Sequence, residues 1–321
     1  MRFGWIGVHT EGLPALEGLL EARAPLAAAI TLRPELAATR SGAADYRTVC
    51  GRAGLPLYEV ANVNDESTLQ LLRDLKLDVV FVIGWSQILK PATLQTARVG
   101  MIGAHASLLP HNRGSAPVNW ALIRGERMTG NSLMWLAEGV DAGDLIDQTA
   151  FCISPYDTCA TLYGRVAESN RDMLLRLLPA LLAGEHPGAP QRHSNEPVLP
   201  RRRPADGLVD WRGDAASIYA FVRALTRPYP GAFSWLDNRR WTIWEAALLP
   251  PALGRVDAMA ASVPGETLGP VVSPTEAACG QVVGCGTGAI LLLQLQADDG
   301  EILCGRRLSE QPWAGRVWTN A

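Results

Sequence analysis

Residues 103–117 read Gly-Ala-His-Ala-Ser-Leu-Leu-Pro-His-Asn-Arg-Gly-Ser-Ala-Pro. They follow a short apolar run at residues 99–102, so His105 is expected where a strand delivers a side chain to the edge of a sheet. The Ser-Leu-Leu-Pro that comes next turns the chain away, and the Arg-Gly pair at 113–114 begins a predicted helix that continues to Ile123. The stretch therefore predicts a strand, a turn and a helix, with a histidine at the strand end.

A second polar cluster, Gly-Val-Asp-Ala-Gly-Asp, occupies residues 139–144 and follows a plausible strand at 129–136. We therefore expect His105 and Asp141 at neighbouring strand ends. Such a placement suits a general base and the carboxylate that orients it. Asp144 is close enough in sequence to take part of the same role.

The first two hundred residues alternate between strand-like and helix-like segments. Short apolar strands are predicted at 3–8, 27–32 and 78–84, and amphipathic helices at 13–22, 66–75 and 157–182. This alternation predicts an α/β fold whose sheet is mostly parallel and Rossmann-like. Open sheets of this kind bind ligands outside the carboxyl ends of their strands. That rule places His105 and Asp141 where a ligand is expected.

A proline-rich stretch divides the chain. Residues 185–206 contain five prolines and few large apolar side chains, which is typical of a linker. Beyond it we predict a helix at 215–225 and short strands at 232–236, 240–247, 281–284, 289–296 and 300–304. Many short strands closed by turns favour a small, OB-like β-barrel. The predicted domains are 1–184, a linker at 185–206, and 207–321.

The composition is that of an ordinary globular protein: 321 residues, 48% hydrophobic, 19% charged, with a net charge of −3. This charge argues against nucleic acid as a partner, and the arginine run at 201–203 is interpreted as a solvated edge of the linker. The six cysteines form no Cys-x-x-Cys pair, so we expect reduced thiols, a cytoplasmic protein and no metal site. The N-terminus is expected to be a first strand, not a signal peptide, and no segment is long enough to cross a membrane. The oligomeric state is left open, a homodimer included.

The two motifs resemble those of the folate-dependent formyltransferases, a family that includes methionyl-tRNA formyltransferase, glycinamide ribonucleotide transformylase and the sugar N-formyltransferases. The family's motifs read Asn-x-His-x-Ser-Leu-Leu-Pro-x-x-Arg-Gly and Asp-x-Gly-Asp. The matching residues here are His105, Ser107, Leu108, Leu109, Pro110, Arg113, Gly114, Pro117, Asp141, Gly143 and Asp144. The segment after the linker is similar to the C-terminal domain of the methionyl-tRNA branch, through an Asp-Trp at 210–211, Arg-Ala-Leu-x-x-Pro-Tyr-Pro-Gly-Ala at 223–232 and Gly-x-Arg-Leu at 305–308.

The resemblance implies catalysis by His105 with Asp141, and it exposes one departure. Where the family carries an Asn that donates a hydrogen bond toward the formyl oxygen, this chain has Gly103. Three explanations stay open. Another donor, such as a backbone N–H near Gly103 or Ser107 or a water molecule, substitutes for the amide; or the extra space admits a different substrate; or the protein binds its ligand without turnover.

The resemblance also implies 10-formyltetrahydrofolate as the formyl donor. By analogy with relatives, the folate site would comprise Trp85, Gln87, Ile88, Leu89, Val140, Gly143 and Asp144. The plain alternative for 84–89 is an apolar cap on the end of a strand. Candidate substrate contacts are His9, which follows the first predicted strand, Ser107, and Arg113, which either binds an anion or pairs with a carboxylate. Residues 7–12 lack Gly-x-Gly-x-x-Gly, which disfavours a dinucleotide cofactor.

These features predict formyl transfer to an amine of a small molecule, either an amino sugar or a natural-product amine or hydroxylamine. Residues 33–41 contain only two arginines and lack the basic extension carried by the tRNA enzymes. Methionyl-tRNA formyltransferase is kept as an alternative. So are a non-catalytic folate- or nucleotide-binding protein and a hydrolase in which water replaces the amine.

Overall fold

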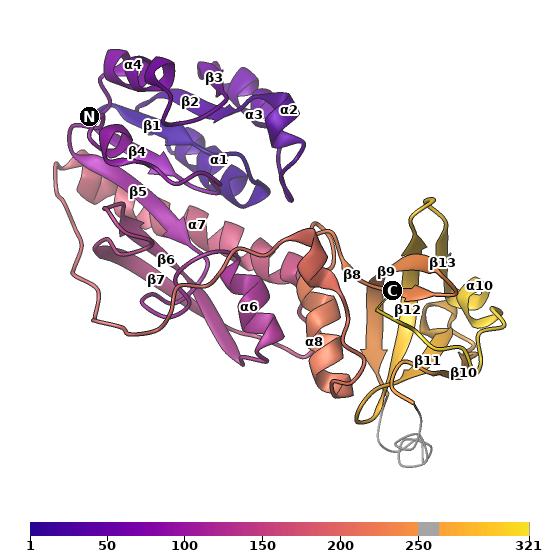
Figure 1. Ribbon diagram of the computed structural model, residues 1–321. Coiled ribbons are helices and arrows are strands. Elements are labelled where there is room, and N and C mark those ends of the chain that lie inside the picture. The colour runs from indigo at the N-terminus through magenta and orange to yellow at the C-terminus, as the bar shows by residue number, and fades with distance from the viewer. Residues whose placement is uncertain (250–262, 321) are drawn as a thin grey trace. The chain divides into compact units, whose positions relative to one another are not determined.

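The computed structural model describes residues 1–249 and 263–320, which form two compact units (Figure 1). The first unit comprises Met1–Val118, Arg127–Ile153 and Thr161–Arg201. The second comprises Asn119–Glu126, Ser154–Ala160 and Arg202–Ala321. No helix among the described residues has both the length and the apolar character needed to cross a bilayer.

The first unit is built on a seven-stranded sheet in the order β3-β2-β1-β4-β5-β6-β7. Its strands are β1 (Phe3–Ile6), β2 (Leu26–Leu32), β3 (Leu57–Val60), β4 (Val79–Val82), β5 (Gly100–His105), β6 (Met128–Trp135) and β7 (Leu145–Cys152). The strands from β3 to β5 pair in parallel, whereas β6 runs antiparallel to β5 and β7 antiparallel to β6. The predicted mostly parallel α/β sheet is confirmed.

Helices cover both faces of this sheet (Figure 1). The helices within residues 1–182 are η1 (Thr10–Gly12), α1 (Leu13–Glu21), α2 (Pro34–Ala37), α3 (Tyr46–Ala53), α4 (Glu66–Leu75), α5 (Pro91–Leu94), α6 (Pro117–Ile123) and α7 (Cys159–Leu182). Most of α6 belongs to the second unit. Side chains from α1, α3 and α7 pack around Trp5 and Phe81 on one face. The other face, with Val80 and Met101, is covered from α4 and α5. Because side chains alternate along a strand, His105 lies on the same face as Met101.

The helix after the first motif begins later than the sequence predicts. Residues 106–116 form turns, and α6 starts at Pro117. Ala116 has a φ of 55° and Gly114 a φ of 113°, and neither is a right-handed helical conformation. Proline is favoured at the first position of a helix, where its missing N–H leaves no hydrogen bond unmade. The motif is therefore a loop and not the first turn of a helix.

The second unit contains an antiparallel sheet in the order β10-β11-β12-β9-β8, with β13 added to β12. Its elements are η2 (Pro204–Gly207), α8 (Ala215–Leu225), β8 (Ala232–Leu236), β9 (Arg239–Leu248), β10 (Thr267–Val271), η4 (Glu276–Ala278), β11 (Gly280–Gly284), β12 (Ala289–Ala297), β13 (Ile302–Cys304) and α10 (Gly305–Ser309). Thr319 bridges to Trp235 in β8, and Val317 bridges to Glu266 just before β10. The C-terminal segment thus joins the two sheet edges, which confirms the predicted small β-barrel.

Candidate active site

His105 is the last residue of β5, and its side chain is only 8% exposed. Its Nδ1 lies 3.4 Å from Asp141 Oδ2, and its Nε2 lies 2.8 Å from the backbone oxygen of Asn112. Both neighbours are hydrogen-bond acceptors when the carboxylate is ionised. A neutral imidazole has one N–H to donate, whereas the doubly protonated ring can donate to both. Each ring nitrogen of His105 therefore has an acceptor beside it, so a proton on either nitrogen can be held by a hydrogen bond.

Asp141 reaches His105 by a route that the sequence did not predict. Since β6 is antiparallel to β5, its last residue, Trp135, pairs with Ile102, three positions before His105. The two residues are thus not at neighbouring strand ends, and the loop between β6 and β7 must return along β5 to bring the carboxylate to the imidazole. Asp141 sits in this loop with a φ of 50°, and its Oδ2 accepts the Gly114 N–H at 2.8 Å.

The shape of this loop depends on Gly143. A Cβ at this position would lie 1.7 Å from the backbone oxygen of Trp135, a distance that no side chain tolerates. The loop is also held from outside, because Gln191 Nε2 donates to the backbone oxygens of both Asp141 and Gly143 at 2.8 Å. The position of Asp141 therefore depends on close backbone packing and on a side chain from a distant segment.

We expect Gly143→Ala to destabilise the protein by about 1–3 kcal/mol, because the added methyl group forces backbone apart in a packed loop. Chemical denaturation measures the free energy of unfolding. Gly164→Ala in α7 is the matched control, since nothing lies within 4 Å of a Cβ there, and alanine is a better helix former than glycine. Equal stability of the two variants would show that the loop can move away from Trp135 at little cost.

A segment of the predicted linker holds both site loops. Arg113 Nη2 donates to the backbone oxygen of Ser194 at 3.1 Å, and His111 Nδ1 lies 2.7 Å from Glu196 Oε2. Leu199 forms a β-bridge with Gly114. With the Gln191 contacts, these interactions make the segment a strap across the loops at 105–114 and 139–144. It belongs to the same compact unit as the site.

The two substrate-contact candidates of the first motif lie within this strapped loop. Ser107 is 1% exposed, and its hydroxyl donates to the His111 backbone oxygen at 2.7 Å. Its backbone oxygen accepts from Ser132 Oγ at 2.6 Å. Arg113 is partly buried, and its Nε is buried with no hydrogen-bond partner among the described residues. The serine is thus used within the loop, whereas the guanidinium retains an unused donor.

The residues expected to contact folate lie on two loops. Gln87, after β4, accepts the Val63 N–H and donates to the Ala61 oxygen, so its amide fastens the loop to the segment after β3. Ile88 is 78% exposed, and Val140 in the other loop is 43% exposed. Trp85 and Leu89 are partly buried against the face that carries His105, while the Asp144 side chain is exposed. The Nε1 of Trp85 is buried without a partner among the described atoms.

His9 follows β1, which is separated from β5 by β4, so it lies on the same sheet edge as His105 but not on a neighbouring strand. Its Nδ1–H donates to the Ser41 backbone oxygen at 2.9 Å. Burial lowers the pKa of the imidazole, and the nearby Arg40 charge lowers it further, against the raising effect of the Ser41 hydrogen bond. His9 is therefore a neutral side chain on the same sheet edge at physiological pH.

Leu136 occupies the space that a side chain at position 103 would enter. A Cβ on Gly103 would lie 2.5 Å from Leu136 Cδ2, and the Leu136 N–H donates to the Met101 oxygen at 2.7 Å. The motif pattern gave no sign of Leu136, although its register at the end of the predicted strand could have indicated it. It also missed Asn112 as the partner of His105, and Gln191, for which the proline-rich segment gives no signal.

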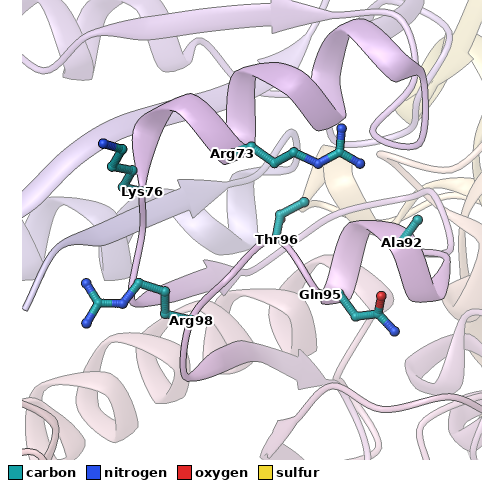
Figure 2. Close-up of a pocket in the computed structure, with 6 residues that line it drawn as sticks. All are labelled: Arg73, Lys76, Ala92, Gln95, Thr96 and Arg98. Carbon is teal, nitrogen blue, oxygen red and sulfur yellow. The ribbon is translucent and has the colours of Figure 1, made fainter.

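A cavity of about 420 Å³ lies elsewhere on the same unit (Figure 2). Its lining residues are Arg73, Lys76, Ala92, Gln95, Thr96 and Arg98. Since Lys76 precedes β4 and Arg98 precedes β5, the cavity lies at the amino ends of these strands, opposite the edge with His105. Its basic side chains point in different directions (Figure 2). It is therefore separate from the His105 site. Among the described residues, no group of three or more His, Cys, Asp or Glu side chains is placed to hold a metal ion.

Solved structures share this fold at low sequence identity. HypX from Aquifex aeolicus, in a complex with tetrahydrofolic acid, is 19% identical over 96% of this chain with a TM-score of 0.65. That match covers 46% of HypX, so this chain spans about half its length. The sugar 3N-formyl transferase WlaRD matches at 14% identity, a TM-score of 0.63, and 94% and 99% of the two chains. An N-formyltransferase from Helicobacter canadensis is 15% identical with a TM-score of 0.64. That match covers 91% of this chain and 98% of the Helicobacter enzyme.

Two family models match consecutive parts of the sequence. The formyl transferase model matches residues 23–178, which include both motifs and the loop that carries Asp141. The model of the formyl transferase C-terminal domain matches residues 202–311, which include the antiparallel sheet of the second unit. Together they cover most of the chain, in the order that the fold requires. The chain belongs to the formyl transferase family.

Proposed function

We propose that this protein transfers a formyl group from 10-formyltetrahydrofolate to an amine of a small molecule, with His105 as general acid and base and Asp141 as the carboxylate that orients it. The observation that carries the proposal is the 3.4 Å pairing of these two side chains within a formyl transferase chain. The amine nitrogen attacks the formyl carbon and the bond to N10 of the folate breaks. One proton moves from the amine to N10.

The geometry supports a specific role for each ring nitrogen. Nδ1 faces Asp141, so Nε2 is the atom that exchanges a proton with the reactants. In the described structure Nε2 contacts the Asn112 oxygen, and a reactant takes the place of that contact during turnover. Positioned acid–base catalysis of this kind contributes about 10²–10⁴ in rate.

Exposed apolar side chains support folate as the donor. Ile88 and Val140 present apolar surface to solvent on the two loops that the family resemblance connects with the pterin. A flat ring that covers them removes this surface from water, at roughly 25 cal/mol per Å². HypX has been solved with tetrahydrofolic acid, and the Helicobacter canadensis enzyme with folinic acid.

When the amine attacks, the formyl oxygen gains negative charge and needs a hydrogen-bond donor. Gly103 has no side chain that could supply one. The Ser107 N–H already donates to the His105 oxygen at 2.8 Å, and Gly103 lies in a strand with neighbours on both sides. Both backbone donors considered from the sequence are therefore committed to the fold. The doubly protonated His105 ring, or a water molecule beside it, is the donor that the geometry favours.

A small acceptor is supported by the segment after β2. Residues 33–41 form a single short helix, α2, and a turn, with no basic loop to contact phosphates along a tRNA. The Helicobacter canadensis enzyme was solved with dTDP-3-aminofucose, and WlaRD is a sugar 3N-formyl transferase. We accordingly place this protein's acceptor among amino sugars and natural-product amines or hydroxylamines, ahead of methionyl-tRNA.

The test is an acceptor panel. Purified protein is mixed with 10-formyltetrahydrofolate and, separately, amino sugars, amino acids, hydroxylamine and methionyl-tRNA, and tetrahydrofolate release is followed optically. Acceptor-dependent release with a small amine supports the proposal, and release with methionyl-tRNA alone overturns its acceptor class. Leu136 fills the space beside Gly103, and this favours a second candidate function, a folate-binding protein without turnover. Tight folate binding with no release from any acceptor would support that candidate instead.

Leu136 stands in the way of restoring the family's amide at position 103. Gly103→Asn alone is expected to leave kcat/KM unchanged or lower, because the new side chain meets Leu136. Gly103→Asn combined with Leu136→Ala makes room for the amide and is expected to raise kcat/KM at least tenfold, given that one oxyanion donor is worth about 10²–10³ in rate. Leu136→Ala alone is the control and should bring no gain. A rise with Gly103→Asn alone, as large as that of the double variant, would show that Leu136 is no obstacle.

A further inference from the structure

Glu11 lies on the same sheet edge as His105, in η1 between β1 and α1. Its Cγ is 3.0 Å from the position that a Cβ on Gly84 would take, so its side chain leans over the end of β4. Because Val82 in β4 pairs with Gly103 in β5, continuing the parallel register puts Gly84 level with His105. Neighbouring strands are about 4.8 Å apart. Glu11 therefore lies at the end of the strand next to β5, on the sheet edge that carries His105.

The backbone around Glu11 is firmly held, without any help from its carboxylate. Asn170 Nδ2 on α7 donates to the Glu11 backbone oxygen at 3.1 Å. The Val8 and His9 N–H groups both donate to the Gly84 oxygen at 3.0 Å. The turn thus presents the same side chain at the same place whether or not its carboxylate is engaged.

The Glu11 carboxylate has no hydrogen bond or ion pair within residues 1–249 and 263–320. Burial of this carboxylate raises its pKa to about 7. Two titratable groups surround it: Tyr46 on α3, whose pKa is raised chiefly by burial, and His9, whose pKa is lowered chiefly by burial. The Arg40 charge acts on His9, but Arg40 makes no ion pair with Glu11 among these residues. A half-buried carboxylate without a partner is costly to keep, and a cationic ligand would supply the partner.

We propose that Glu11 binds the ammonium group of the acceptor and takes its first proton. The inference rests on the proposed function, and it narrows the acceptor to an aliphatic amine that is protonated at neutral pH. The ammonium gives one proton to the carboxylate and becomes a neutral amine. That amine attacks the formyl carbon, and its next proton passes through His105 to N10 as the bond to the folate breaks. Hydroxylamine, largely neutral at pH 7, has no such proton to give.

The test compares Glu11→Gln with Glu17→Gln, an exposed carboxylate on α1, as the matched control. With the most active amino sugar of the panel, we expect Glu11→Gln to raise the acceptor KM about 10–100-fold. Binding of 5-formyltetrahydrofolate and the KM for hydroxylamine should stay within twofold of wild type. Equal losses for both acceptors, or weaker folate binding, would overturn the proposal. An unchanged KM would overturn it while leaving formyl transfer intact, whereas a wild-type protein that transfers to no acceptor would overturn both.

The pH dependence gives a second readout. Glu11 binds a cation only when ionised, so its contribution is present above about pH 7 and is lost as the pH falls through that value. The ratio of wild-type to Glu11→Gln kcat/KM should therefore approach one near about pH 5. Because the folded state favours the protonated carboxyl, ionisation destabilises it. The Glu11→Gln variant should then have a higher melting temperature than wild type at about pH 8, and the same melting temperature at about pH 5. A lower melting temperature at pH 8 would reveal a structural partner and overturn the proposal.

Discussion

Replacing His105 with alanine is expected to lower kcat/KM for formyl transfer by about 10²–10⁴, because the variant lacks the group that moves the proton from the amine to N10. Steady-state kinetics with 10-formyltetrahydrofolate and the best acceptor of the panel measures the loss. His105 is almost fully buried, so circular dichroism and the unfolding midpoint must show that the variant folds.

The matched control for this variant is His193→Ala. His193 belongs to the same compact unit and is exposed. Its replacement should leave kcat/KM within twofold of wild type. A folded His105→Ala variant that retains more than a tenth of the wild-type rate would contradict the assignment of the acid–base role.

Asp141→Asn is expected to lower kcat by about 10² or more with little change in the KM for the folate donor. The amide oxygen can still accept the Gly114 N–H, so the loop keeps its shape, but the negative charge beside His105 Nδ1 is lost. Carboxylates that orient a catalytic histidine have effects of this size. A fall in kcat alone indicates an interaction made in the transition state.

Asp144→Asn is the control for the carboxylate, because Asp144 is in the same motif and is exposed. It should keep nearly wild-type kcat. If the two substitutions lower kcat equally, Asp144 shares the role, as the sequence alone left open. If neither lowers it, the carboxylate beside His105 is not needed for the reaction.

Much of the fold could be predicted from local patterns. The helix at 215–225 and the strand at 232–236 have the predicted bounds. The helix begins where the Asp214 side chain accepts the Ser217 N–H, a capping signal readable in the sequence. The hairpin after the strand turns at Asp237-Asn238, and both residues have positive φ, which these residue types tolerate well.

The strands that went unpredicted in the first unit have a common cause. β3 and β7 are the two edges of its sheet. Edge strands are only partly buried, and every residue of β7 is at least partly exposed to solvent. The apolar run that marks a buried parallel strand such as β4 is therefore missing from them.

The two motifs predicted that His105 and Asp141 lie close together, but they did not predict the path of the chain between them. The antiparallel direction of β6 depends on pairing with β5, which local patterns do not encode. The strap contacts of Gln191 and Glu196 are equally hidden, because each joins residues about 50 or more positions apart. The only pattern in the sequence of residues 185–206 is the high proline content, and this pattern indicated a linker.

Tracing an isotope-labelled formyl group tests the central claim most directly. The label is supplied on 10-formyltetrahydrofolate, and mass spectrometry follows it into formylated acceptor, formate and remaining folate. We predict acceptor-dependent transfer of the label to the amine, with stoichiometric tetrahydrofolate, and loss of this product with His105→Ala. Label found only in formate would mean that water is the acceptor. Label that stays on the folate with every acceptor would contradict catalysis by this site.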